Sequence, residues 1–369
     1  MDITIINKII NNINKTKKQI LIASPSKEDP NYYYYWIRDS SLSIRPIVDI
    51  YYRTNDLTYF KYILNYIEFE YELLTLQTIS GNGEPKVNVD GKAFNDEWGR
   101  PQNDGPAIRG YTMIIIYNII KNQFPSLANK LVLPIIENDI KYICSAINTP
   151  CFDLWEEKYG WHFYTRLVQL KFIKEMIDFI KNNKNININY NLDIILDENM
   201  EKIKAHFFEF NGNIKIVSNL KTDGSICKKH DASIFLAFCH INFDKWFLNK
   251  INMKSCENTY NSLLNYFCKK YDNEENYMIG RYKHDNYFEG HVWHICILGF
   301  CQVLLKLYPN NNDIILFCKK VFNDIIKIDN DLNISEQYNV NTKEQISAKN
   351  LTWNYSELYY LYLNLKHHL

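Results

Sequence analysis

Three glutamates in this chain could carry acid–base chemistry. Glu156 and Glu157 are adjacent and directly follow Trp155 in the segment DLWEEKYG, and Glu336 lies much further along the chain in SEQY. Hydrolysis of a glycosidic bond uses two carboxyl groups, a protonated acid for the leaving oxygen and an ionised carboxylate on the other face of the sugar. The glutamates can supply this pair if the fold brings them together.

Tryptophans and hydrogen-bonding charged residues surround these glutamates in the sequence. Flat aromatic faces beside bidentate donors and acceptors suit a sugar, whose ring faces are apolar and whose edge carries hydroxyls. The tryptophans are Trp36, Trp98, Trp155, Trp293 and Trp353, and the charged residues are Arg38, Asp39, Arg100, Asp104 and Arg281.

Each of these motifs also has a structural interpretation. Asp39 or Ser40 can cap a helix, and adjacent glutamates often mark a solvated helix entry. His291 and His294 lack the carboxylate or cysteine that would complete a zinc site, so we expect core or rim histidines and no metal or cofactor. The convergence of the motifs in space decides between the two interpretations.

Helical periodicity recurs from end to end, and twelve segments start near residues 3, 38, 56, 105, 127, 161, 192, 230, 253, 289, 312 and 351. The motif-rich stretches all precede even-numbered segments. If the helices alternate in direction around a ring, these loops meet at one end. The sequence predicts an all-α fold, an (α/α)6 toroid with the active site in the loops at the N-terminal ends of the inner helices. Residues 85–94 and 211–217 predict loops or small hairpins, and the absence of a composition break predicts one domain, 1–369.

Composition excludes several classes of function. Lys+Arg and Asp+Glu are both 42, so no net charge attracts nucleic acid or anionic lipid, and no apolar run reaches membrane-spanning length. The nine cysteines contain no CxxC pair, and the N-terminus does not read as a signal peptide. We therefore expect a cytoplasmic monomer with no nucleic-acid or membrane partner; a secreted or vacuolar location is less consistent with the sequence.

Longer segments of the chain resemble glycoside hydrolase family 15, the glucoamylases. The matching stretches are ILIASPSKEDPNYYYYWIRDSSL, GEPKVNVDGKAFNDEWGRPQNDGPAIR, FDLWEEKYGWHFYTRLVQ, GRYKHDNYFEGHVW and SEQY…EQISAKNLTWNYSEL. They run from about residue 21 to the end of the chain. The resemblance implies the same toroidal fold and an inverting exo-hydrolase that releases β-D-glucose from the non-reducing ends of α-1,4-glucans such as glycogen, starch or maltooligosaccharides.

The resemblance also assigns roles where the motifs coincide. It makes Glu156 the general acid and Glu336 the general base, and it places an ionised Glu157 on sugar hydroxyls beside the protonated acid. The substrate-binding residues that it implies are Tyr32, Arg38, Asp39, Trp98, Trp155, Glu157, Arg281 and Trp353.

The chain departs from the family pattern at one motif, where GNPW is replaced by Gly290-His291-Val292-Trp293 and the preceding Asn by Glu289. These replacements are expected to reshape outer subsites. The chain ends at the twelfth helix, so no starch-binding domain is expected. Two alternatives stay open: a relative acting on another α-glucoside, such as trehalose, isomaltose or dextran, or a catalytically silent glucan-binding or regulatory protein.

Overall fold

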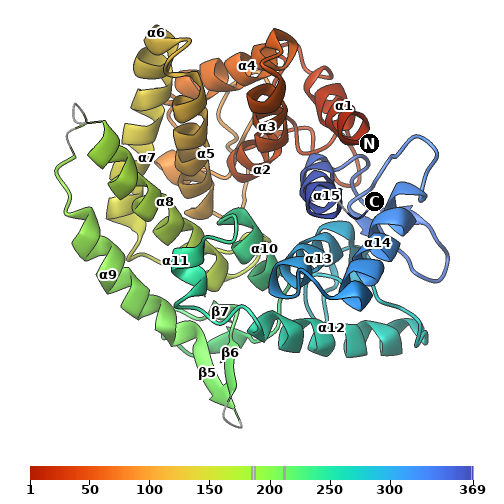
Figure 1. The fold of residues 1–369 in the computed structure, drawn as a ribbon. Coiled ribbons are helices and arrows are strands. Elements are labelled where there is room, and N and C mark those ends of the chain that lie inside the picture. Colours follow the sequence, from red (N-terminus) through yellow and green to blue (C-terminus); the bar gives the residue numbers. More distant parts are fainter. Residues whose placement is uncertain (184–185, 187, 211–212, 367, 369) are drawn as a thin grey trace.

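The computed structural model describes residues 1–369 apart from 184–185, 187, 211–212, 367 and 369. Within this part of the chain, twelve helices form two concentric rings (Figure 1). The inner ring consists of α2 (Ile37–Ser43), α5 (Asp104–Ile120), α8 (Phe163–Asn182), α10 (Ser233–His240), α13 (His294–Leu307) and α15 (Thr352–Leu365). The outer ring consists of α1 (Asp2–Ile13), α4 (Leu57–Leu73), α7 (Leu133–Ala146), α9 (Leu192–Lys202), α12 (Ser255–Tyr271) and α14 (Asn312–Ile326).

The inner ring is closed. Each inner helix packs against the next in chain order, and α15 packs back against α2. The predicted (α/α)6 toroid is therefore present, and inner helices such as α5 and α13 are buried on nearly all sides because they contact two neighbours and an outer helix.

Three shorter segments complete the helical framework. Helix α3 (Arg45–Thr54) continues α2 after a break at Pro46, whose missing N–H cannot extend the helix. A turn of helix, α6 (Pro125–Leu127), and a π-helical stretch, Ala128–Val132, lead into α7. The short α11 (Lys245–Leu248) follows α10.

Close packing of α5 against α8 depends on a glycine. A Cβ atom added at Gly110 would lie 2.2 Å from the ring of Phe172. Any side chain at this position would force Phe172 or the helix to move, since real Cβ contacts do not become that short.

Ten of the twelve helix starts agree with the prediction to within three residues. The helix expected near 127 has its α-helical part, α7, from Leu133, after the turn of α6 and the π-helical stretch. The helix expected near 289 begins at His294. Phe288, Glu289 and Gly290 have φ angles of 46°, 62° and 62°, a left-handed conformation that an α-helix cannot contain. These residues instead form a 3-10 turn, Tyr287–Gly290, before the short strand β9 (Val292–Trp293).

Short strands connect the loops at the N-terminal ends of the inner helices. Strand β1 (Tyr35–Trp36) pairs with β2 (Lys86–Val87). Strands β3 (Cys151–Phe152), β4 (Tyr159–His162), β7 (Asn219–Leu220) and β8 (Ile226–Lys228) form a second sheet, and β9, β10 (Gln337–Tyr338) and β11 (Gln345–Ile346) form a third. Each sheet contains strands from two consecutive loops, so the six loops are joined in pairs.

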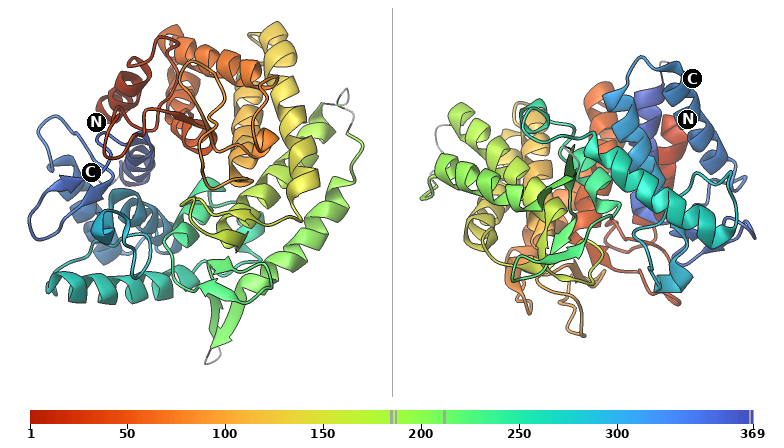
Figure 2. Two further views of the ribbon diagram at one scale, coloured as in Figure 1. Left: turned by 180° about the vertical axis from the view of Figure 1, so that it is seen from behind. Right: turned by 90° about the horizontal axis from the view of Figure 1, so that it is seen from below.

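Hydrogen bonds between backbones join these pairs into a circle. Phe152 N–H donates to Pro101, Ala232 N–H to Arg281, and Thr352 N–H to Ala23. The side view in Figure 2 shows the long loops extending from one end of the helical ring. The sequence did not predict this circle of strand and backbone contacts.

Both short hairpins expected from the sequence are accounted for. Val87 bridges to Ala93 within 85–94. Strand β6 (Asn213–Ile216) pairs with β5 (Phe207–Phe210) in a hairpin that projects from the ring, and residues 211–212 of the second stretch lie outside the described residues (Figure 1). Among the described helices, none combines the length and apolar character needed to cross a membrane.

Candidate active site

The N-terminal ends of the inner helices surround a cavity. Eight of the ten predicted site residues line it, and Trp98 and Glu157 lie beside it, bonded to residues of the lining. The lining consists of Ala23, Tyr32, Trp36, Arg38, Asp39, Leu154, Trp155, Glu156, Arg281, Trp293, Glu336, Leu351 and Trp353. The loops before α2, α8, α13 and α15 supply this lining, and the loops before α5 and α10 reach it through Trp98 and Asp231, which bond Glu156 and Trp155.

Glu156 accepts hydrogen bonds from two loops of the chain. Trp36 Nε1 donates to its Oε1 at 2.7 Å, Trp98 Nε1 to its Oε2 at 2.7 Å, and Gln102 Nε2 to Oε1 at 3.0 Å. The guanidinium of Arg38 lies 3.6 Å from Oε1. The carboxyl group is thus fixed in orientation on both oxygens.

The backbone around Glu156 is held just as firmly. Glu156 has a φ of 67°, and its N–H donates to the carbonyl of Asp153 at 2.8 Å. A Cβ at Gly99 would lie 2.5 Å from the Glu156 carbonyl, so only glycine lets the neighbouring loop approach this closely.

Asp153 organises the turn that carries the two glutamates. Its Oδ1 accepts the N–H groups of Glu157 and Lys158 at 2.9 and 3.1 Å, and its Oδ2 accepts Nζ of Lys228 at 2.9 Å. Burial opposes ionisation of Asp153, but Lys228, His162 and the donated N–H groups outweigh it and hold its pKa far below the usual range.

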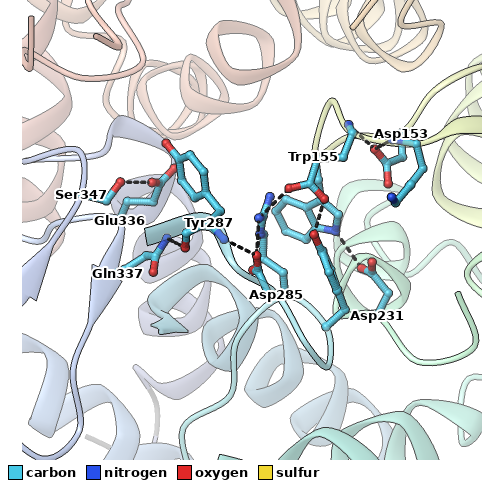
Figure 3. Close-up of polar contacts among 12 residues, drawn as sticks. Asp153, Trp155, Asp231, Asp285, Tyr287, Glu336, Gln337 and Ser347 are labelled. Carbon is cyan, nitrogen blue, oxygen red and sulfur yellow. Dashed lines mark hydrogen bonds and ion pairs between the residues drawn. The ribbon is translucent and has the colours of Figure 1, made fainter. Parts of the chain in front are cut away.

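Glu157 is directed at a different partner from Glu156. Arg281 Nη2 lies 2.7 Å from Glu157 Oε1, and the hydroxyl of Tyr282 donates to Oε2. Arg281 in turn donates to both carboxylate oxygens of Asp285, each at 2.8 Å. Figure 3 shows Asp285 within this polar wall of the pocket, close to Trp155. The charge of Glu157 is therefore compensated by Arg281.

Glu336 is enclosed in a separate environment. Its side chain is 2% exposed, and Ser347 Oγ donates to Oε2 (Figure 3). Burial raises the pKa of Glu336 to about 7; the hydroxyls of Ser347 and Tyr32 and the charge of Arg281 only partly oppose this shift. Tyr32 lies within hydrogen-bonding distance of Tyr287, 2.8 Å between the hydroxyl oxygens.

Arg38 and Asp39 begin helix α2 and point into the pocket. Arg38 Nη1 donates to Gln102 at 2.9 Å and to Asp104 at 3.1 Å. Asp39 Oδ2 and Arg38 Nε are buried without a hydrogen-bond partner, at 3.4 Å from each other. Burial raises the pKa of Asp39 to about 6, although Arg38 opposes the shift. Buried polar groups normally have partners, so these atoms are available for ligand hydroxyls.

Tryptophan faces form the apolar walls. Trp155 stacks at 6.4 Å from Trp353 and meets Trp293 edge-on at 5.6 Å. The Arg281 guanidinium lies 5.5 Å from the Trp155 ring. Trp155 Nε1 donates to Asp231 at 2.8 Å, as Figure 3 shows, which fixes the plane of the indole.

A hydrogen-bonded cluster of Tyr164, His240 and Glu357, which we call the plug, lies beside Trp353. Trp353 Nε1 donates to Glu357 at 3.0 Å, and His240 Nε2 donates to the same oxygen at 2.9 Å. That leaves His240 Nδ1 to accept from the Tyr164 hydroxyl at 2.7 Å. His240 and Glu357 also line a separate cavity at the opposite end of the barrel, so the plug stands between the two.

Several site residues were not predicted as such. Trp36, predicted only as one of the flat tryptophan faces, and Gln102 bond Glu156, and both lie inside the quoted motifs, in YYYYWIRDS and GRPQ. Asp285 and Ser347 likewise lie in GRYKHD and ISAKN. The motifs marked the right loops, but no spacing rule in the sequence indicated which side chain contacts which glutamate.

Other candidates have structural roles. Arg100 pairs with Glu84 at 2.9 Å, and Asp104 supports Arg38. His291 is buried against the ring of Tyr271 and bonds its hydroxyl, and the Glu289 side chain is 88% exposed. Neither Glu289 nor His291 lines the pocket, and their expected effect on outer subsites stays a prediction.

Comparison with known proteins gives consistent results. Glucoamylase-1 of Arthroderma benhamiae is 38% identical over 174 residues, 45% of this chain and 28% of that protein. Glucoamylase 1 of Rhizopus oryzae is 30% identical over 305 residues, 78% of this chain and 50% of that protein. The chain thus spans half or less of the length of these relatives. The solved structure of Hormoconis resinae glucoamylase superposes with a TM-score of 0.85 at 24% identity, covering 100% of this chain and 73% of that one.

The profile of Glycosyl hydrolases family 15 matches residues 4–307, which include Glu156 and end before Glu336 and Trp353. This match covers most of the chain, and the toroidal fold and the convergence of the motifs on one pocket agree with it. The chain belongs to the glycosyl hydrolases family 15.

Proposed function

We propose that this protein is an inverting exo-hydrolase that releases β-D-glucose from the non-reducing ends of α-1,4-glucans. The observation that carries the proposal is the placement of Glu156 and Glu336 in one pocket with contrasting partners. Their loops precede α8 and α15, which stand three places apart in a ring of six. Carboxyl groups on opposite sides of the mouth can act on opposite faces of a sugar ring.

Glu156 is suited to donate a proton to the glycosidic oxygen. Its Oε1 already accepts from Trp36 and Gln102, whereas Oε2 accepts only from Trp98. A carboxylate oxygen has two lone-pair sites, so the proton belongs on Oε2. After the proton leaves, the same three N–H groups stabilise the carboxylate that remains.

Glu336 is suited to activate water. Ser347 donates to Oε2 of its carboxylate, and the side chain lines the cavity. A base whose pKa lies near the working pH combines a useful ionised fraction with a strong affinity for the proton. The pKa of about 7 places Glu336 in this range.

The terminal glucose would be bound at the bottom of the pocket. Arg38 and Asp39 present unpartnered buried atoms for its hydroxyls, and Trp155 and Trp353 offer flat faces to its ring. Because the plug blocks the barrel axis below, only the end of a glucan chain can enter. This geometry supports exo-action and a substrate such as maltooligosaccharide, starch or glycogen.

One panel of substrates tests the proposal. Purified protein is incubated with maltoheptaose, trehalose and isomaltose in parallel, and glucose is measured enzymatically. Release chiefly from maltoheptaose supports the proposal. Release chiefly from trehalose or isomaltose would assign the protein to another α-glucoside, and binding of maltoheptaose without glucose release would indicate a silent glucan-binding protein.

A further inference from the structure

A buried lysine, Lys86, lies against the two tryptophans that bond Glu156, the proposed acid. Lys86 is 1% exposed, and its Nζ has no hydrogen bond or carboxylate partner among the residues that the structure describes. An unpaired ammonium buried in this way is costly unless something replaces water. The groups around Lys86 must therefore compensate its charge.

Four aromatic rings surround the ammonium. Nζ lies 3.1 Å from the ring centre of Trp98, 4.3 Å from Phe94, 4.4 Å from Trp36 and 4.6 Å from Tyr34. Ring faces attract cations, and the attraction increases when water is excluded. These four residues, which we call the aromatic box, supply the missing compensation.

The box is closed by contacts between its own walls. Tyr34 contacts Trp36 at 5.9 Å, and Trp36 contacts Trp98 at 6.2 Å. Trp98 contacts Phe94 at 5.9 Å, and Phe94 contacts Tyr34 at 5.3 Å. The rings come from two loops, and the pairing of Trp36 with Lys86 across β1 and β2 places the ammonium between them.

Two walls of the box are the indoles that hold the acid. Trp36 donates to Oε1 of Glu156 and Trp98 to Oε2, both at 2.7 Å. A cation held against both rings fixes their planes and so the direction of both N–H groups. It also polarises each indole so that its N–H becomes a stronger donor to the carboxylate left after proton transfer.

We propose that Lys86 is a positioning residue, which orients Glu156 and stabilises its ionised product through the aromatic box. This inference rests on the proposed function, since it assigns a role only if Glu156 is the acid. Lys86 does not line the pocket and does not contact substrate. Replacing Lys86 should therefore slow the step in which Glu156 donates its proton to the leaving group.

The test compares two substrates that differ in their need for the acid. Maltoheptaose has a sugar alkoxide leaving group that must be protonated, whereas α-D-glucosyl fluoride has a leaving group that needs little help. Lys86→Met keeps the length of the side chain and removes its charge. Lys250→Met is the matched control, because Lys250 lies 4.6 Å from the ring of Trp246, away from the pocket.

Lys86→Met should lower kcat on maltoheptaose about 10-fold to 100-fold, with a nearly unchanged KM and a much smaller loss on the fluoride. Lys250→Met should match wild type on both substrates. An equal loss on both substrates, or no loss on either, would overturn the role of Lys86. Phe94→Leu, which opens one wall and keeps the charge, should give a weaker form of the same pattern and serves if Lys86→Met does not fold.

The same measurements distinguish a failure of the proposed function from a failure of the role of Lys86. Wild-type protein that hydrolyses neither substrate would contradict the proposed function, and the role of Lys86 would fall with it. Wild-type protein that hydrolyses both, with equal losses for Lys86→Met and Phe94→Leu on the two substrates, would contradict only the role of Lys86.

Discussion

At the scale of single residues, the roles of the three glutamates follow from their partners. Glu156 has N–H donors on both oxygens, Glu157 has a guanidinium, and Glu336 has a hydroxyl inside a nearly closed environment. Residue type alone could not separate them. On the proposed function, their surroundings suit proton donation, hydroxyl binding and water activation, and each role can be tested by a change at one position.

Glu156→Gln should abolish turnover while substrate binding survives. The amide removes the proton donor, which contributes about 10² to 10⁴ in rate, and leaves the hydroxyl contacts of Arg38 and Asp39 intact. Steady-state kinetics on maltoheptaose and calorimetric titration of the variant measure the two effects. Glu68→Gln, an exposed change on α4, is the control. Near-normal turnover in Glu156→Gln would remove Glu156 from the role of acid.

Asp39→Asn should lower kcat/KM on maltooligosaccharides by about 10³, because a pocket built for hydroxyls discriminates strongly when one of its acceptors is lost. Asp39 Oδ2 is buried, lies 3.4 Å from Arg38 Nε and has no hydrogen-bond partner among the described residues, so the loss should appear chiefly in catalysis. Kinetic measurements and the melting temperature of the same preparation separate a loss of catalysis from a loss of stability. Wild-type kinetics would return Asp39 to a helix-capping role.

Glu336 should make the protein less stable as the pH rises. Its folded-state pKa of about 7 lies above the ordinary value of 4.5, so folding favours the protonated form. The stabilisation is complete below about pH 4.5 and is lost as the pH rises through about 7, a difference on the order of 3 kcal/mol.

Glu336→Gln removes this titration. The variant should match wild type at pH 4 and exceed it in stability at pH 8, measured by urea unfolding at each pH. Asp39, whose pKa is also raised, titrates in both proteins, and its charge contributes to the shift of Glu336. In wild type, kcat/KM should increase as the pH approaches 7, because the base must be ionised to act. A stability difference independent of pH would contradict the raised pKa.

At the scale of elements, the sequence predicted the helices well and the connections poorly. Apolar spacing locates a helix such as α4 because burial repeats along one face. The error at residue 289 came from Phe288 and Glu289, whose left-handed backbone is set by the surrounding loop and has no signature in their types. Pairing of β1 with β2, or of β4 with β7, involves two to four residues from distant loops and leaves no periodic signal.

The sequence likewise predicted the site residues that belong to motifs but not the contacts between loops. Motif positions indicated Glu156, Glu336, Arg38 and Asp39, because their roles are tied to the loops that carry them. The Trp36, Trp98 and Gln102 donors depend on how the loops before α2, α5 and α8 meet, which only the folded chain determines. The contact between Lys86 and four rings is likewise a product of strand register.

Gly110→Ala tests the packing of α5 against α8. The added methyl group would lie 2.2 Å from the Phe172 ring, and overpacking of this kind costs about 1–3 kcal/mol. Urea unfolding measures the loss. Phe172→Leu makes room, so the double variant should recover part of the stability that the two single changes lose together. Strictly additive losses would contradict direct contact.

At the scale of the whole molecule, the ring places the loops that carry Glu156 and Glu336 across from each other. A water activated by Glu336 would attack the anomeric carbon from the side opposite to Glu156, so an α-linked substrate should first yield β-glucose. Proton NMR of the anomeric region in the opening minutes of hydrolysis detects it before mutarotation. Initial α-glucose, or a glycosyl ester trapped on Glu336, would contradict the inverting mechanism.

The plug of Tyr164, His240 and Glu357 determines by which route a product can leave the pocket. Because the barrel is closed beneath Trp353, a released glucose can leave only through the mouth by which the glucan entered. The shortened chain still occupies that mouth after each cut. It must withdraw before the glucose can escape, and a new chain end, its own or another, must then enter. The enzyme would therefore trim many chains by one unit each in turn, as a distributive catalyst, and would not run along a single chain.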